Sequence, residues 1–250
     1  MKLKSEFIKG KRSALALAQK EFISYLNTPS FFGATVFFLI FCAIGLFYFQ
    51  DFIRMNTASM RPYFSVFPLV FILVIPVLTM KSWAEERKTG SVELLLTMPL
   101  SEWDLVLGKF LAVLSLLLVM LVFTIPLPIT LSPLGDFDIG VILCEYIGAL
   151  LMGSSAIALG LLLSSLSKNQ AGSFVGCAVV LMITMLADQL AFALNLPMWL
   201  TRGVNAISLA FHFESFTKGL LDSRNVIYYL ASTYLFLFLT TRVLIFRKWR

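Results

Sequence analysis

The chain has 250 residues, of which 59% are hydrophobic and only 14% are charged. Soluble domains use roughly 45–50% apolar residues, so this composition excludes an ordinary soluble domain and indicates an integral membrane protein. The formal net charge is +6. In a membrane protein, the distribution of basic residues indicates first of all which loops are cytoplasmic. We therefore do not interpret the positive charge as a nucleic-acid-binding surface, and we expect no nucleic-acid partner.

Six apolar runs are long enough to cross a membrane, since a hydrocarbon core of about 30 Å needs roughly 20 helical residues. Each span should be a helix, because an isolated strand would leave backbone N–H and C=O groups unpaired in lipid. The sequence therefore predicts a single all-α, polytopic domain over residues 1–250, with spans at about 31–49, 62–80, 105–131, 141–165, 172–194 and 226–246.

Basic residues are divided unevenly by this topology. With a cytoplasmic N-terminus, fifteen Lys and Arg residues fall on the cytoplasmic side and five on the other. Such an excess predicts that both termini are cytoplasmic.

An amphipathic helix is expected before the first span. Apolar residues recur there at helical spacing, at Leu15, Ala18, Phe22 and Leu26. This pattern predicts a helix that lies along the membrane surface and ends near Thr28-Pro29, because the residue before a proline disfavours helix. A frayed basic tail is the alternative.

The stretch KSWAEERKTGSVELLLTMPLSEWDLVLGKF, residues 81–110, interrupts the apolar pattern with carboxylates at Glu85, Glu86, Glu93, Glu102 and Asp104. These could act as general acids or bases only if some were buried and paired. Basic residues interleave with them on the expected cytoplasmic side, which favours a docking platform over an active site. Gly90 and Pro99 divide the stretch into pieces at about 82–89, 91–98 and 101–109, and Ser101 is the expected N-cap of the last.

Motifs for catalysis or nucleotide binding are not found in the sequence. The pair Gly108-Lys109 lacks both the first glycine and the Ser or Thr of a phosphate-binding loop. His212 is the sole histidine, so a zinc site is not expected. Cys42, Cys144 and Cys177 are far apart in apolar runs and argue against disulfides or a metal cluster.

Small residues mark the expected helix contacts of the fourth and fifth spans. One stripe includes Ala149, Gly153 and Gly160, and the next span opens with Gly172 and Gly176 in a GxxxG arrangement. Such spacing lets helices approach closely. We expect packing between spans or across a dimer.

Two acids, Glu145 and Asp188, fall inside predicted spans toward the outer leaflet. An intramembrane acid is costly and suggests a transport pathway or an ion pair. At this depth simple snorkelling to interfacial water is an equal alternative. The aromatic-rich connection 195–225 predicts one or two short helices at the outer leaflet, with Gly203 and Gly219 near bends.

Residues 83–114, WAEERKTGSVELLLTMPLSEWDLVLGKFLAVL, resemble the cytoplasmic segment of ABC-2 type transporter permeases. The similarity continues over 147–175, with its small-residue stripe and cytoplasmic turn. Residues 212–244 are similar to the last outer loop and sixth span of the branch that contains the gliding-motility permease and the nitrous-oxide-reductase maturation permease. The resemblance covers nearly the whole chain.

This resemblance implies a six-span permease subunit in a bacterial cytoplasmic (inner) membrane that pairs with a second copy or a paralogue. Two copies of a separate ATPase subunit would hold ATP and Mg, with no cofactor and no catalytic residue on this chain. The helix between spans two and three would dock into the ATPase through Glu85, Glu86, Arg87, Lys88, Gly90 and Glu93. The N-terminal helix would be a second contact, and an outer or periplasmic accessory protein and membrane lipid are further expected partners.

An alternative function is an ion-coupled secondary transporter or channel that uses Glu145 and Asp188. It would be driven by a proton or sodium gradient without any ATPase. A membrane-embedded enzyme is a third, weaker alternative, because no catalytic set is visible. The substrate is left open by the sequence.

Overall fold

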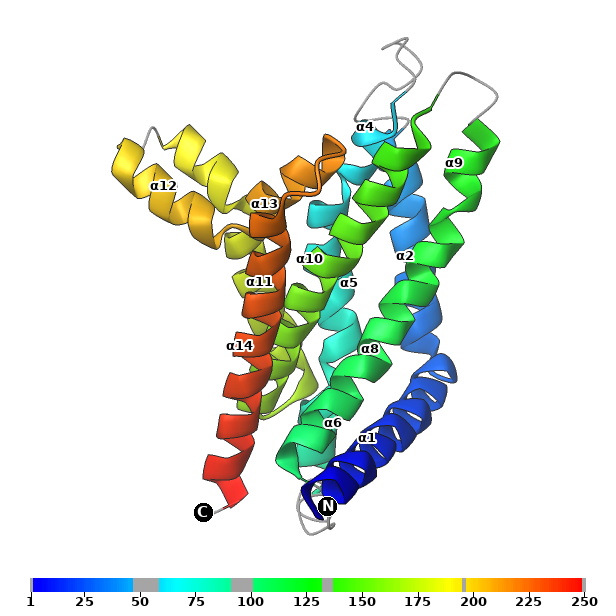
Figure 1. Cartoon of the computed structure of the whole chain (residues 1–250), viewed down its shortest axis with the longest axis vertical. Helices are drawn as coiled ribbons and strands as arrows, with labels where there is room; N and C mark the ends of the chain where they lie inside the picture. Colours follow the sequence, from blue (N-terminus) through cyan, green and yellow to red (C-terminus); the bar gives the residue numbers. More distant parts are fainter. Residues whose placement is uncertain (1, 47–58, 91–100, 132–136, 195–196, 249–250) are drawn as a thin grey trace.

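The computed structural model describes residues 2–46, 59–90, 101–131, 137–194 and 197–248, and every element assigned within these ranges is a helix. Figure 1 shows the helices gathered into an elongated bundle. Their bounds are α1 Lys2–Leu26, α2 Pro29–Ile44, α4 Arg61–Phe64, α5 Phe67–Thr79, α6 Lys81–Lys88, α8 Glu102–Thr124, α9 Pro126–Leu131, α10 Ile139–Leu166, α11 Gln170–Ala193, α12 Met198–Ile207, α13 Leu209–Thr217 and α14 Ser223–Lys248.

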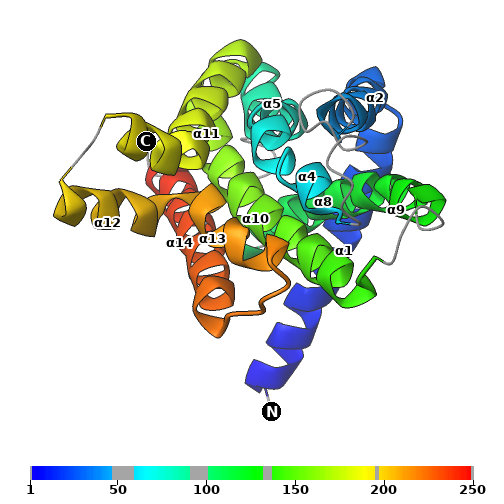
Figure 2. The ribbon, with the colours of Figure 1, turned by 90° about the horizontal axis from the view of Figure 1, so that it is seen from above.

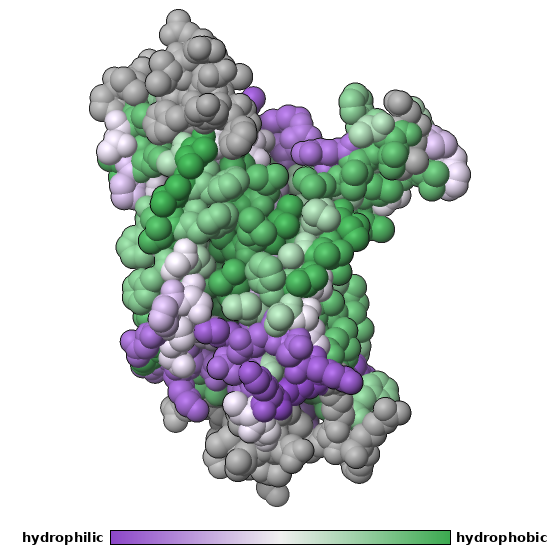
Figure 3. Space-filling model, turned by 180° about the vertical axis from the view of Figure 1, so that it is seen from behind, coloured by the Kyte–Doolittle hydropathy of each residue, from purple (hydrophilic) through white to green (hydrophobic). Residues whose placement is uncertain are grey.

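Five helical segments among the described residues are long and apolar enough to cross a membrane: Arg61–Lys88, Glu102–Leu131, Ile139–Leu166, Gln170–Ala193 and Ser223–Phe246. A sixth is reached if Ala14–Leu26 and Pro29–Ile44, which are bent by 75° at their junction, count as one span. Figure 3 shows a hydrophobic belt around the middle of one face, with hydrophilic residues gathered toward one end. The chain is therefore a multi-pass, all-α membrane protein, as the sequence predicted.

The two ends of the bundle differ in what they hold. We call them the α6 end, where α6, the start of α8 and both chain termini lie, and the α4 end, where α4, α9 and α13 lie (Figure 1). The start of α1 and the end of α14 thus lie at the same end of the bundle.

The first predicted span, 31–49, is only partly described. Helix α2 covers Pro29–Ile44, and residues 47–49 lie outside the described ranges. The helix before it ends at Leu26, and Thr28 has an extended backbone, with φ −94° and ψ 134°. Proline disfavours helical geometry in the residue before it, so the expected break near Thr28-Pro29 is confirmed.

Helix α10 is the centre of the bundle, with α5, α8, α11, α13 and α14 packed around it (Figure 2). Its small residues allow this. A Cβ added at Gly160 would lie 2.5 Å from Thr79 Oγ1, and one at Gly153 would collide with Leu117. Ala149 is fully buried. These close approaches explain why α10 can touch so many neighbours.

The two glycines that open α11, Gly172 and Gly176, are not in close contact with neighbouring helices as those of α10 are. A Cβ at Gly172 would meet only the side chain of its own cap, Asn169, and nothing lies within 4 Å of one at Gly176. Within the described part of a single chain, the GxxxG pair therefore packs against no other helix. Contact across a dimer stays a prediction.

The region after α11 forms two short helices. Helix α12 extends away from the bundle in Figure 1, whereas Phe213 and Phe216 of α13 are buried. Gly219 ends this region with φ +74°, which suits the expected bend. Gly203, expected near a bend, lies inside α12 instead, because the chain turns at Ser208 between the two helices.

Candidate functional site

Helix α6, Lys81–Lys88, follows α5 with only Met80 between them. It is the first piece of the predicted docking segment and ends before Gly90, which has φ +72°. This left-handed backbone favours glycine, since a Cβ would crowd the following carbonyl. The third expected piece, about 101–109, is not a separate surface helix. It is the first part of α8, which runs on from its confirmed N-cap, Ser101.

The one internal lysine of α8, Lys109, is buried and paired in this region. Lys109 is 2% exposed, and its Nζ lies 2.6 Å from Oε1 of Glu86 on α6 and 3.7 Å from Oε1 of Glu21 on α1. The ammonium also donates to the carbonyl of Ser82 at 2.7 Å and lies 4.8 Å from the ring centroid of Trp83. A buried charge with several such partners can be accommodated, whereas an unpaired one is strongly unfavourable.

The same cluster includes a neutral hydrogen bond and a close backbone approach. Tyr25 Oη on α1 lies 2.8 Å from Ser82 Oγ on α6. Gly108 of α8 sits against Leu17 and the carbonyl of Ala14, and this lets α1 lie directly along α8. We call these contacts between α1, α6 and α8, centred on Lys109, the Lys109 cluster.

Helix α6 is also bonded to the central helix. Ser164 Oγ of α10 accepts from the backbone N–H groups of Trp83 at 3.2 Å and Ala84 at 3.3 Å. Beyond it, the guanidinium of Arg87 donates to the carbonyls of Leu166 and Ser167 at the end of α10. Helix α6 is therefore fixed to three neighbours, α1, α8 and α10.

The structure divides the predicted docking residues into two groups. Glu86 and Arg87 make the intramolecular contacts described above, whereas Glu85, Lys88 and Gly90 are exposed. Glu93 lies outside the described residues. Docking by these residues stays a prediction, and the exposed members are its cleanest test.

Sequence reasoning missed the role of Lys109 and Glu21. From the sequence, Lys109 was placed on the cytoplasmic side and within the segment that resembles the permease family, but it was not expected to be buried and paired. The available signal was its position: a lysine that begins a long apolar run needs a counter-charge, because burial of an unpaired ammonium is costly.

The intramembrane acids lie toward the other end. Glu145 is fully buried, and both of its carboxylate oxygens lack a hydrogen-bond partner among the described residues. It does not snorkel to water. Asp188 is partly exposed, with Oδ1 buried and likewise unpartnered, and no hydrogen bond joins the two acids in the part of the chain that the structure describes. The structure thus does not bring them together as one site.

Metal-binding residues do not cluster. In the described ranges, no group of three or more His, Cys, Asp and Glu side chains could hold an ion. His212 instead pairs its Nδ1 with Asn225 Oδ1 at 2.7 Å and stacks on Tyr228 at 3.8 Å between centroids. Its contacts are those of a structural residue.

Comparison with known proteins matches residues 54–246 to the family described as ABC-2 family transporter protein. Over 155 residues, 62% of the chain, it is 30% identical to proteins named probable multidrug ABC transporter permease YbhR from Escherichia coli strains K12 and O157:H7. The aligned region is 41% of those proteins, so the chain spans about two-fifths of the length of the curated relatives it matches.

Proposed function

This chain belongs to the ABC-2 family of transporter proteins, and from that premise we propose that it couples ATP hydrolysis on a separate ATPase subunit to movement of its own spans. The observation that carries the proposal is the Lys109 cluster. Through it, the segment that interrupts the apolar pattern is bonded to α1 and α8, and Ser164 bonds the same segment to α10.

The proposed mechanism begins at the exposed face of α6. Glu85 and Lys88 contact the ATPase, and α1 provides a second contact. When ATP binding in the partner moves α6, the buried ion pairs carry α8 and α1 with it, because separating Lys109 from Glu86 would leave charges buried without partners. ATP and Mg²⁺ are held by the partner, and this chain contributes neither cofactor nor catalytic group.

The assembly contains two permease chains and two ATPase chains, in a bacterial inner membrane with both termini in the cytoplasm. The second permease is a copy or a paralogue. Transport of a substrate and transmission of force to a periplasmic partner are both compatible with this arrangement.

The first experiment asks where ATP binds. The tagged chain is purified from its own cells and labelled with a photoreactive ATP analogue. We expect the label on a separate chain that co-purifies. A label on this chain, or the lack of any co-purifying ATP-binding chain, would contradict the proposal.

The second experiment tests the docking surface by charge reversal. Glu85→Lys and Lys88→Glu should reduce co-purification of the ATPase, because the reversed charges meet like charges on the partner, while membrane insertion is retained. Glu214→Lys is the control, since Glu214 is also exposed but belongs to α13. Glu86→Lys is a poor test because the new lysine would face Lys109. Unchanged co-purification in both α6 variants would refute the docking assignment.

Ion-coupled transport is the second candidate, favoured by the unpartnered, fully buried carboxylate of Glu145. It predicts gradient-driven uptake in vesicles that contain this chain alone, abolished by Glu145→Gln. Uptake that requires the ATPase subunit and ATP would exclude it.

A further inference from the structure

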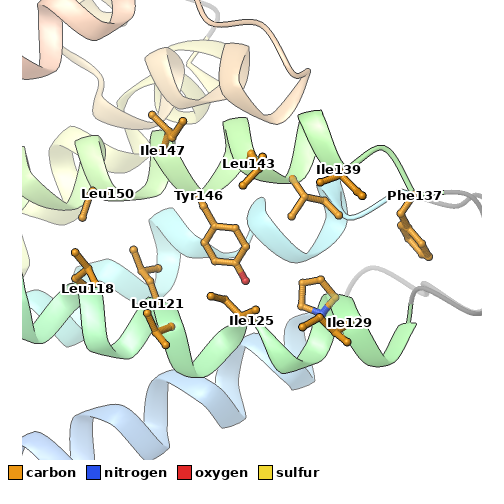
Figure 4. Close-up of a pocket in the computed structure, with 13 residues that line it drawn as sticks. Leu118, Leu121, Ile125, Ile129, Phe137, Ile139, Leu143, Tyr146, Ile147 and Leu150 are labelled. Atoms are coloured by element: carbon orange, nitrogen blue, oxygen red, sulfur yellow. The ribbon is translucent and has the colours of Figure 1, made fainter.

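A large apolar groove runs between two spans near the α4 end. It has a volume of about 810 Å³ and lies between α8–α9 on one side and α10 on the other, with Leu121, Ile125 and Ile129 facing Leu143 and Ile147. Figure 4 shows the two walls with Tyr146 between them. Its size is that of a small-molecule site, for which about 300–1,000 Å³ is usual.

The groove exists because the two walls diverge. Helix α8 ends at Thr124, and the chain resumes as α9 at Pro126, a residue with no N–H to continue the hydrogen-bond ladder. Within the groove the two walls are bridged, since Tyr146 Oη lies 3.0 Å from Thr124 Oγ1. The hydroxyls at the floor are therefore satisfied, and the rest of the lining is apolar.

The groove opens toward the surroundings of the bundle. Several of its side chains are substantially exposed, among them Ile129 at 63% and Leu143 at 58%. These helices are membrane spans, so the groove faces the hydrocarbon region. An acyl chain is the apolar partner available there.

A second, polar cavity of about 350 Å³ adjoins this groove and shares Phe137 and Ile142 with it. Arg61, at the start of α4, and Asp138 are its charged members. Asp138 Oδ1 already accepts from the backbone of Gly140 at 2.8 Å as the cap of α10. The guanidinium of Arg61 makes no hydrogen bond or ion pair with any described residue and is exposed, although its charge also acts on the buried carboxylate of Glu145.

We propose that the groove and the polar cavity together bind a membrane phospholipid. One acyl chain lies in the groove, and the headgroup phosphate accepts hydrogen bonds from Arg61. The chemistry is complementary at both ends: an apolar lining for the chain, and a planar guanidinium that suits the oxygens of a phosphate. The site goes beyond the proposed ATPase coupling and involves no residue of the Lys109 cluster.

The test uses two lipid probes with the same photoreactive acyl chain, phosphatidylglycerol with its phosphate and diacylglycerol without it. The full chain is placed in nanodiscs, cross-linked and mapped by mass spectrometry. We expect the phosphatidylglycerol probe to label α8–α9 and α10 peptides more than it labels α14. Arg61→Gln should lower that labelling about 3- to 10-fold, the loss expected for one solvent-screened, charge-assisted hydrogen bond.

Two controls separate the site from general lipid contact. Arg224→Gln removes another exposed arginine, outside the cavity, and should leave labelling unchanged. Leu143→Trp fills the groove and should reduce labelling, whereas Leu235→Trp on α14, where Leu235 is 52% exposed, should not. Variants are compared only after size-exclusion profiles match the unmodified chain.

Three results would overturn the proposal. Uniform labelling of all the membrane-facing helices would mean that the probe contacts the protein only as non-specific boundary lipid. Equal labelling by both probes, or indifference to Arg61→Gln, would mean an apolar groove without a phosphate site. Labelling absent from α8–α9 and α10 would mean that another protein surface, such as a second copy, covers the groove.

Discussion

Replacing Lys109 by methionine should be the most damaging single change at the α6 end. The substitution keeps the length of the side chain but removes the charge that pairs with Glu86 and Glu21. Removing one partner of a buried ion pair costs about 3–5 kcal/mol. Because each glutamate side chain keeps 17% exposure, water relieves part of the penalty, and we expect the low end, about 3 kcal/mol. For a chain of this size that lowers Tm by about 6–12 °C.

The assay is thermal unfolding of the detergent-purified chain, followed by fluorescence-detected size exclusion. Lys218→Met is the matched control: Lys218 also pairs with a glutamate, at 2.7 Å, but is 52% exposed, so its loss should cost about 0–1 kcal/mol. Adding Glu86→Gln to Lys109→Met should recover about 1–3 kcal/mol, as expected for directly contacting partners. Equal Tm values for the two lysine variants, or strict additivity in the double variant, would refute the description of a buried, coupled pair.

Two glycine comparisons follow from the same structure. Gly160→Leu should destabilise by about 1–3 kcal/mol through overpacking against Thr79, while Gly176→Leu, with nothing within 4 Å, should leave the Tm of the single chain unchanged; equal effects would contradict the packing of α10. A shift of the Gly176→Leu variant from dimer to monomer in size exclusion would place that glycine at a dimer contact. Gly90→Ala should cost about 1–2 kcal/mol because a Cβ is unfavourable at φ +72°, whereas Gly33→Ala, in ordinary helix with open space, should cost nothing; a Gly90→Ala variant as stable as the unmodified chain would show that this backbone is not retained.

The general fold could be predicted from the sequence because each span is determined by the residues within it. Length and apolarity located the spans, and the caps located two starts: Ser101 before α8, and Pro29 after the break that ends α1. These signals act within a few residues along the chain. No knowledge of neighbours is needed to use them.

The Lys109 cluster was harder to predict from the sequence, because its contacts join residues that are far apart along the chain. The pairing of Lys109 with Glu86 and Glu21 follows from how α1 and α6 pack on α8. The amphipathic pattern of α1 also does not identify which of its residues contact the bundle. Leu15 is 60% exposed, whereas Ala14 and Ala18 are buried, and Gly108 of α8 lies against Leu17 and the carbonyl of Ala14. Likewise, the depth of Glu145 depends on helices that cover it, not on its distance from the end of its own span.

The close approach of Thr79 to Gly160 has a mechanical consequence. The segment Arg61–Lys88 passes as one span of 28 residues, about 42 Å long at about 1.5 Å per residue. Thr79 lies about 14 Å from its Lys88 end and about 27 Å from its Arg61 end by the same rise. For a rotation of this segment about that contact, the two arms would be in a ratio of about one to two. In such a rotation, a small displacement of Lys88 is roughly doubled at Arg61, where the polar cavity lies.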